Sequence, residues 1–89
     1  MNDSAARLEE GVLSILSDYL GLPISELKPE KSLEELGADS LDFIEIVFEL
    51  EEKFGVKSGL DLPQLRAKIH VVGDVLQLTA DLVAAKQAE

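Results

Sequence analysis

Apolar residues in this chain recur at three- and four-residue intervals, and this spacing constrains the fold more than any other feature. A helix places residues three and four apart on one face, whereas a half-buried strand alternates apolar and polar residues. We find no such alternation, no internal repeat and no low-complexity tract. The sequence therefore predicts an all-α fold, a small four-helix bundle with three longer helices, one short helix and a long first loop.

The helix boundaries are predicted from the places where the apolar pattern begins and stops. The first helix should run over about residues 4–20, with Ser4 as its N-cap and a Gly and a Pro following its end. The second should run over residues 40–54 and end at a glycine. A short helix is expected near residues 64–69, and a last helix over residues 72–86.

The connection between the first two helices spans residues 21–38 and combines helix-breaking residues with large aliphatic ones. Its prolines and serines oppose regular structure. A solvated linker, however, has no need of five large aliphatic side chains, so we expect this loop to pack across the core. These residues are Leu22, Ile24, Leu27, Leu33 and Leu36.

Length and composition exclude several classes of protein. With 89 residues and no cysteine, residues 1–89 are predicted to be a single domain without disulfides or a thiolate metal site. A net charge of −10 and the absence of Trp oppose binding to nucleic acid and to anionic membranes. No apolar stretch is long enough for a membrane span, and acidic residues stand where a secretory signal would need basic ones. We expect a cytoplasmic monomer that inserts into no membrane.

The negative charge is concentrated in the middle of the chain. Residues 34–52 hold eight acidic residues and no Lys or Arg, whereas residues 53–89 hold four acidic residues and five Lys or Arg. An acidic segment of this density suits docking of partners with basic patches. Because an acidic face can also serve solubility alone, the motif inside the segment must decide between the two interpretations.

That motif is the string Gly-Ala-Asp-Ser-Leu-Asp at residues 37–42, at the start of the second predicted helix. Asp39 can cap the helix, with Asp42 as its reciprocal partner three residues later. Ser40 then lies in the first turn, where unpaired backbone N–H groups and the positive end of the helix dipole accommodate a phosphate. The pattern predicts a hydroxyl that is presented to another enzyme.

The residues around this hydroxyl favour presentation over catalysis. Gly37 and Ala38 are small enough to let another protein approach closely. Leu41 and Phe48 fall outside the core face of the helix and offer apolar anchors for a partner. His70 is the only histidine and is expected in a loop or a helix cap. No Gly-x-Ser-x-Gly elbow is present either. Ser40 therefore lacks both the positioned base and the sharp turn that a hydrolase nucleophile requires.

These features resemble the acyl carrier proteins, and the resemblance covers most of the chain. It implies a carrier, not an enzyme, whose Ser40 is esterified to 4′-phosphopantetheine taken from coenzyme A by a phosphopantetheinyl transferase. The thiol of that arm would hold acyl groups as thioesters, which fits a chain that has no cysteine of its own. The matching residues are Gly37-Ala38-Asp39-Ser40-Leu41-Asp42, Glu45-Ile46-Val47, Leu50-Glu51-Glu52-Lys53-Phe54-Gly55 and Val72-Gly73-Asp74.

The resemblance also implies roles for the acidic helix. Asp39 would help to bind the Mg²⁺ used by the transferase, and acyl-processing enzymes would dock through basic patches. The residues implied to meet these partners are Leu41, Asp42, Glu45, Phe48, Glu51 and Glu52. The acyl chain would shelter between helices, with a lining drawn from Ile44, Ile46, Val47, Phe48 and aliphatic residues of the last helix.

Fatty acid biosynthesis is the pathway that the resemblance first implies. Many members of the family carry Ile-Pro and acidic residues after the second helix, whereas this chain has Val-Lys-Ser-Gly-Leu-Asp-Leu-Pro at residues 56–63, followed by Arg66 and Lys68. These departures leave open a specialised lipid or polyketide pathway. Two other functions stay open on the sequence: an aminoacyl or peptidyl carrier with the same serine chemistry, and an acidic interaction module that carries no prosthetic group.

Overall fold

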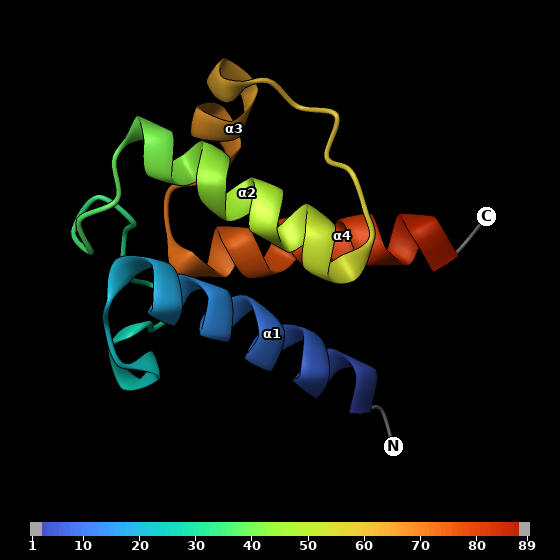
Figure 1. Ribbon diagram of the computed structural model, residues 1–89, viewed down its shortest axis with the longest axis horizontal. Coiled ribbons are helices and arrows are strands. Elements are labelled where there is room, and N and C mark those ends of the chain that lie inside the picture. The colour runs from blue at the N-terminus through green and yellow to red at the C-terminus, as the bar shows by residue number, and fades with distance from the viewer. Residues whose placement is uncertain (1–2, 88–89) are drawn as a thin grey trace.

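The computed structural model describes residues 3–87 and contains four α-helices. They are α1 (Asp3–Leu20), α2 (Ser40–Phe54), α3 (Leu62–Lys68) and α4 (Val72–Gln87), and a short 3₁₀ helix, η1 (Ile24–Glu26), lies in the first loop. Helix α1 packs on α2 and α4, while α3 packs on α2 (Figure 1). The predicted all-α four-helix bundle is confirmed.

Helix α2 has the predicted bounds because both of its ends are fixed by nearby residues. Asp39 caps its beginning. At its end Gly55 adopts a left-handed conformation with φ 66°, which glycine enters without steric cost. Its N–H donates to the carbonyl of Glu51. The candidate serine therefore lies in the first turn of a helix that is capped at both ends.

Two predicted helix starts are wrong. Helix α1 begins at Asp3, so Ser4 lies inside the helix and is not its N-cap. Residues 2–4 are Asn, Asp and Ser, which are all favoured N-cap types, so the sequence does not rank them. Helix α3 begins at Leu62, two residues earlier than predicted, because Asp61 and Gln64 form a reciprocal capping box at 3.0 Å in each direction.

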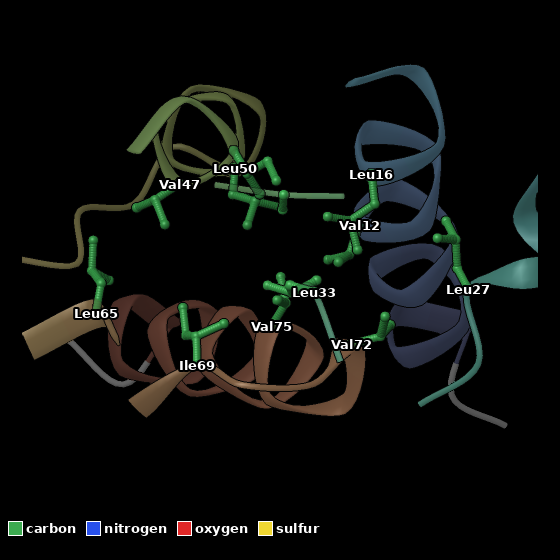
Figure 2. Packing of buried hydrophobic residues seen from close by; sticks show 12 residues of the cluster. Val12, Leu16, Leu27, Leu33, Val47, Leu50, Leu65, Ile69, Val72 and Val75 are labelled. Carbon is green, nitrogen blue, oxygen red and sulfur yellow. The ribbon is translucent and has the colours of Figure 1, made fainter. Parts of the chain in front are cut away.

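The core lies where α1, α2 and α4 meet and the first loop crosses them (Figure 2). The one buried polar side chain among the described residues, Thr79, donates its hydroxyl to the Val75 carbonyl at 2.9 Å, so no polar atom is left unsatisfied there. The buried apolar cluster consists of Val12, Leu16, Leu27, Leu33, Ala38, Ile46, Val47, Leu50, Leu65, Ile69, Val72 and Val75.

The first loop packs across the core, as predicted, but not through all five aliphatic residues. Leu27 and Leu33 are buried, and Leu22 and Leu36 are partly buried against the same cluster. Ile24 is 50% exposed because it stands in η1, which turns its side chain out of the core. The prediction that Ile24 packs inward is wrong.

Backbone hydrogen bonds fasten this loop to the junction of α3 and α4. The Leu33 N–H donates to the His70 carbonyl at 2.9 Å, and the Val72 N–H donates to the Lys31 carbonyl at 2.9 Å. An isolated bridge joins Ser32 and Val71 at the same place. The junction between the last two helices is thereby held beside the segment that leads into Ser40.

Asp74 stabilises the start of α4, and we expect its contribution to depend on pH. The N–H groups of His70 and Val71 donate to Asp74 Oδ2 at 2.9 and 3.1 Å, and these bonds hold the pKa of this carboxyl below its usual value. The stability is therefore present above the unfolded pKa of about 3.9 and is lost as the pH falls through the lower folded pKa.

Substitution Asp74→Asn should lower the free energy of unfolding at pH 7 by about 0.3–1 kcal/mol, the usual contribution of a negative charge in the first turn of a helix. The difference from the wild type should shrink below pH 4, where the aspartate also becomes neutral. Urea unfolding at pH 7 and pH 3 measures both values. If the free energies of unfolding of the wild type and the variant differed by the same amount at both pH values, the charge-assisted role of Asp74 would be contradicted.

Candidate functional site

The beginning of α2 is built by a reciprocal capping box. Asp42 N–H donates to Asp39 Oδ1 at 3.0 Å, and Asp39 N–H donates to Asp42 Oδ2 at 2.8 Å. Phe43 N–H donates to the Asp39 carbonyl at 3.1 Å. The N–H groups of Ser40 and Leu41 lie outside the box, so they are the first-turn donors available to an anion.

Ser40 lies next to an open hollow of about 420 Å³ and is partly exposed. Three segments surround the hollow: the end of the first loop, the start of α2, and the end of α3 with the residues that follow it. Their lining residues are Ser32, Glu34, Ala38, Asp39, Ser40, Phe43, Arg66, Ile69 and His70. The predicted presentation of the Ser40 hydroxyl at an accessible helix start matches this geometry.

The two small residues before Asp39 have different roles. Gly37 is exposed and has φ 92°, a conformation that side-chain-bearing residues rarely adopt, so a glycine is needed at this turn. Ala38 is only 7% exposed and belongs to the core, and its N–H donates to the Leu33 carbonyl at 3.0 Å. Ala38 also lines the hollow beside Ser40, so this small residue both anchors the loop and leaves room there.

Four residues form an exposed stripe along α2: Leu41, Glu45, Phe48 and Glu52. At 100° per residue their side chains lie within about 60° of arc, because they follow one another at four- and three-residue steps. Leu41 is 71% exposed and Phe48 is 59% exposed, so neither is part of the core. Glu45 and Glu52 are exposed as well. The stripe combines apolar anchors with negative charge.

The other two acidic residues of the predicted docking set have partners inside the molecule. Asp42 belongs to the capping box. Glu51 is partly buried, and its Oε2 accepts a hydrogen bond from the Ser58 N–H at 2.8 Å, which holds the loop after α2. These two carboxylates are therefore already engaged when a partner arrives.

A second cavity, of about 220 Å³, lies between α2 and the segment that includes α3. Ile44, Val47 and Phe48 line it, as predicted for an acyl shelter, together with Leu60, Leu62 and Leu65 and the polar Glu51, Ser58 and Asp61. Ile46 was expected in this lining but is 2% exposed in the core, and no residue of α4 lines the cavity. This cavity is therefore lined by three of the residues predicted for an acyl shelter, and Ile46 and the last helix do not reach it.

Three residues near Ser40 were not assigned to the site from the sequence. Tyr19, at the end of α1, faces the start of α2: burial raises the pKa of its hydroxyl, and a hydrogen bond to Asp42 together with nearby carboxylates raises it further. Arg66 and His70 line the hollow beside Ser40. The only sequence signal for Arg66 and His70 is the basic character of the region after residue 63, and no sequence signal indicates Tyr19.

Neither a metal cluster nor a membrane span is found in the part of the chain that the structure describes. Within residues 3–87, no group of three or more His, Cys, Asp or Glu side chains is arranged to hold a metal ion. None of the helices there combines the length and the apolar character that crossing a membrane requires.

Comparison with known proteins places this geometry in a family. Residues 10–66, more than half of the chain, match the family described as phosphopantetheine attachment site. An acyl carrier protein of Nitratidesulfovibrio vulgaris is 44% identical over 81 residues, covering 90% of this chain and 97% of the relative. An acyl carrier protein of Saccharopolyspora erythraea is 41% identical over 76 residues, covering 84% of this chain and 77% of the relative.

Family membership decides between the functions that the sequence left open. Members of this family carry acyl groups as thioesters on 4′-phosphopantetheine, and they interact with phosphopantetheinyl transferases and acyl-processing enzymes. An acidic interaction module without a prosthetic group is not consistent with this membership. The chain belongs to the acyl carrier proteins of the phosphopantetheine attachment family, and it is a carrier of acyl thioesters rather than an enzyme.

Proposed function

We propose that Ser40 is the residue that carries the phosphopantetheine arm. The observation that supports this most directly is the position of Ser40, partly exposed at the start of α2, beside an open hollow, and inside the segment that matches the family. The unpaired N–H groups of Ser40 and Leu41 and the positive end of the helix dipole would stabilise the negative charge of a phosphodiester. The residues present thus fit the group.

Attachment is a transfer from coenzyme A to this hydroxyl. The bond that forms joins Ser40 Oγ to phosphorus, the pyrophosphate bond of coenzyme A breaks, and the adenosine bisphosphate half leaves while the serine proton passes to a base of the transferase. This chain supplies the positioned hydroxyl. Asp39 is exposed beside it, and we propose that one of its carboxylate oxygens contacts the Mg²⁺ that neutralises the pyrophosphate.

The exposed stripe of α2 is the proposed docking surface for basic partners. Leu41 and Phe48 would insert into apolar pockets, while Glu45 and Glu52 would face Lys and Arg side chains. Asp42 and Glu51 would add negative potential while remaining bonded within the molecule. Each exposed ion pair contributes only about 0–1 kcal/mol, so this surface favours fast, reversible encounters that suit a shuttle.

The proposed cargo is an acyl chain of fatty acid biosynthesis or a related specialised lipid or polyketide pathway. The relatives are named acyl carrier proteins, which supports acyl over aminoacyl cargo. The cavity between α2 and α3 has an apolar wall formed by Val47, Phe48 and Leu65, among others, and would shelter such a chain from water. Mass spectrometry of the thioester on protein taken from its own cells identifies the cargo.

We further propose that residues 1–89 act as one carrier domain, monomeric and cytoplasmic, with no affinity for nucleic acid. Support comes from the net charge of −10, which makes copies of the chain repel one another and repel phosphate backbones. Sedimentation of the holo protein at low salt tests the oligomeric state: a concentration-dependent dimer would contradict this part of the proposal.

The proposed function is tested by loading the purified protein. Incubation with coenzyme A, Mg²⁺ and a broad-specificity phosphopantetheinyl transferase should add the mass of one phosphopantetheine arm, measured on the intact protein. Fragmentation should place the added mass on Ser40. A protein that gains no mass, or gains it on another residue, would overturn the proposal.

Charge reversal on the stripe should weaken docking. The variant Glu45→Lys replaces an attractive charge with a repulsive one, so we expect the KM of the transferase for this chain to rise by about fivefold at low salt, which corresponds to about 1 kcal/mol. The matched control is Glu9→Lys, which makes the same charge change on the exposed surface of α1. Equal effects in both variants would show that only the net charge matters.

A further inference from the structure

Arg66 faces the same hollow as the attachment serine, and its charge has no part in the function described so far. It lies in the last turn of α3, twenty-six residues after Ser40 in the chain, yet both residues line the hollow of about 420 Å³. His70, in the connection to α4, lines it too. The backbone bonds between the first loop and the α3–α4 junction hold these elements together.

The other charged groups of the hollow are acidic. Glu34 and Asp39 line it beside Ser40, so a phosphodiester placed there would meet two like charges. The dipole at the start of α2 offsets part of this repulsion. A guanidinium in the same lining offsets it further, because its planar N–H groups match two phosphate oxygens and it stays charged at all physiological pH values.

His70 is less suited to this role. Its ring nitrogen Nε2 lies 3.1 Å from the Ala67 carbonyl, and a carbonyl can only accept, so Nε2 carries the proton and is already engaged. That leaves one ring nitrogen of His70 for a further partner, whereas the Arg66 guanidinium is always charged and offers five N–H donors. Arg66 is therefore the cation of this hollow that suits an anion better.

We propose that Arg66 binds the phosphodiester of the arm within the carrier itself and thereby positions the arm along α3. This inference rests on the proposed attachment to Ser40, because Ser40 lines the hollow and an arm attached there begins beside it. The cavity lined by Val47 and Leu65 is also bounded by α3, so an arm held at Arg66 lies against a helix that borders this cavity. Arg66 is a positioning residue and takes no part in the transfer.

The test compares matched variants of the holo protein. Arg66→Gln removes the proposed contact. Lys68→Gln removes one positive charge from the same helix turn, but Lys68 lines a different hollow, with Asp74 and Asp81. After loading is confirmed by intact mass, the ³¹P resonance of the arm should shift in Arg66→Gln relative to wild type and should stay in place in Lys68→Gln.

A second readout uses the wild type alone and does not depend on the folding or loading of any variant. The chain has two arginines, Arg7 on α1 and Arg66. On conversion from apo to holo protein, the Arg66 Nε–Hε signal in a ¹H–¹⁵N spectrum should move several-fold further than that of Arg7. An unmoved Arg66 signal, or equal ³¹P shifts in the two variants, would overturn the inference, whereas a wild type that takes up no arm overturns the proposed function instead.

Discussion

Replacing Ser40 with alanine is expected to abolish loading completely, the largest functional effect of any single substitution in this chain. The substitution removes the only atom that the proposal places in the bond to phosphorus. The N-cap of α2 is Asp39, and the capping box does not use the Ser40 side chain, so the helix should keep its start. Intact mass after incubation with coenzyme A, Mg²⁺ and transferase should equal that of the untreated variant.

Ser32 provides the matched control, because it is the other serine that lines the same hollow. Its hydroxyl accepts a hydrogen bond from the Glu35 N–H at 3.0 Å, which gives it a structural task. Ser32→Ala should still gain one arm. Loading that survives in Ser40→Ala and disappears in Ser32→Ala would move the attachment site to the first loop and would refute the assignment of Ser40.

Substitution Leu16→Ala should cause the largest loss of stability. Leu16 is fully buried in α1 at the centre of the core, and shortening it leaves a cavity that the surrounding helices fill only in part. The expected cost is about 2–5 kcal/mol in the free energy of unfolding. Since a domain of this size has about 5–15 kcal/mol in total, this is a large fraction. Thermal unfolding should move down by about 4–8 °C per kcal/mol.

Leu41→Ala makes the same chemical change at a residue that is 71% exposed and is the control for this prediction. Its free energy of unfolding should stay within about 0.5 kcal/mol of the wild type. Urea unfolding monitored by far-ultraviolet circular dichroism compares the two variants. Similar losses in both would mean that Leu41 packs into the structure and does not belong to an exposed docking stripe.

Local sequence signals were sufficient for the element that carries the site. The bounds of α2 were predicted correctly because its two ends depend on neighbouring residues: Asp39 with Asp42 at one end and Gly55 at the other. The exposure of Leu41 and Phe48 followed from helical periodicity alone. Where several adjacent residues are all favoured N-cap types, as in the Asn-Asp-Ser sequence of residues 2–4, the same signals are ambiguous.

The lining of the two cavities could not be obtained in this way. Whether Ile46 or Leu60 borders the space between α2 and α3 depends on the rotation of one helix against the other and on the path of the loop between them. The hydrogen bond from Ser58 to Glu51 spans seven residues and fixes that loop. The sequence pattern identifies the apolar face of α2, but it does not show which residues of that face border a cavity.

The sequence alone determined the helices, the acidic stripe of α2 and the presentation of Ser40 at a helix start, because each depends on residues within a few positions of one another. Only the tertiary structure decided that Arg66 shares a hollow with Ser40. That proximity depends on the route of the first loop, which is set by its buried leucines and by backbone bonds such as the one from Leu33 to His70. Contacts between residues far apart in the chain form only when the whole core packs, so no local pattern encodes them.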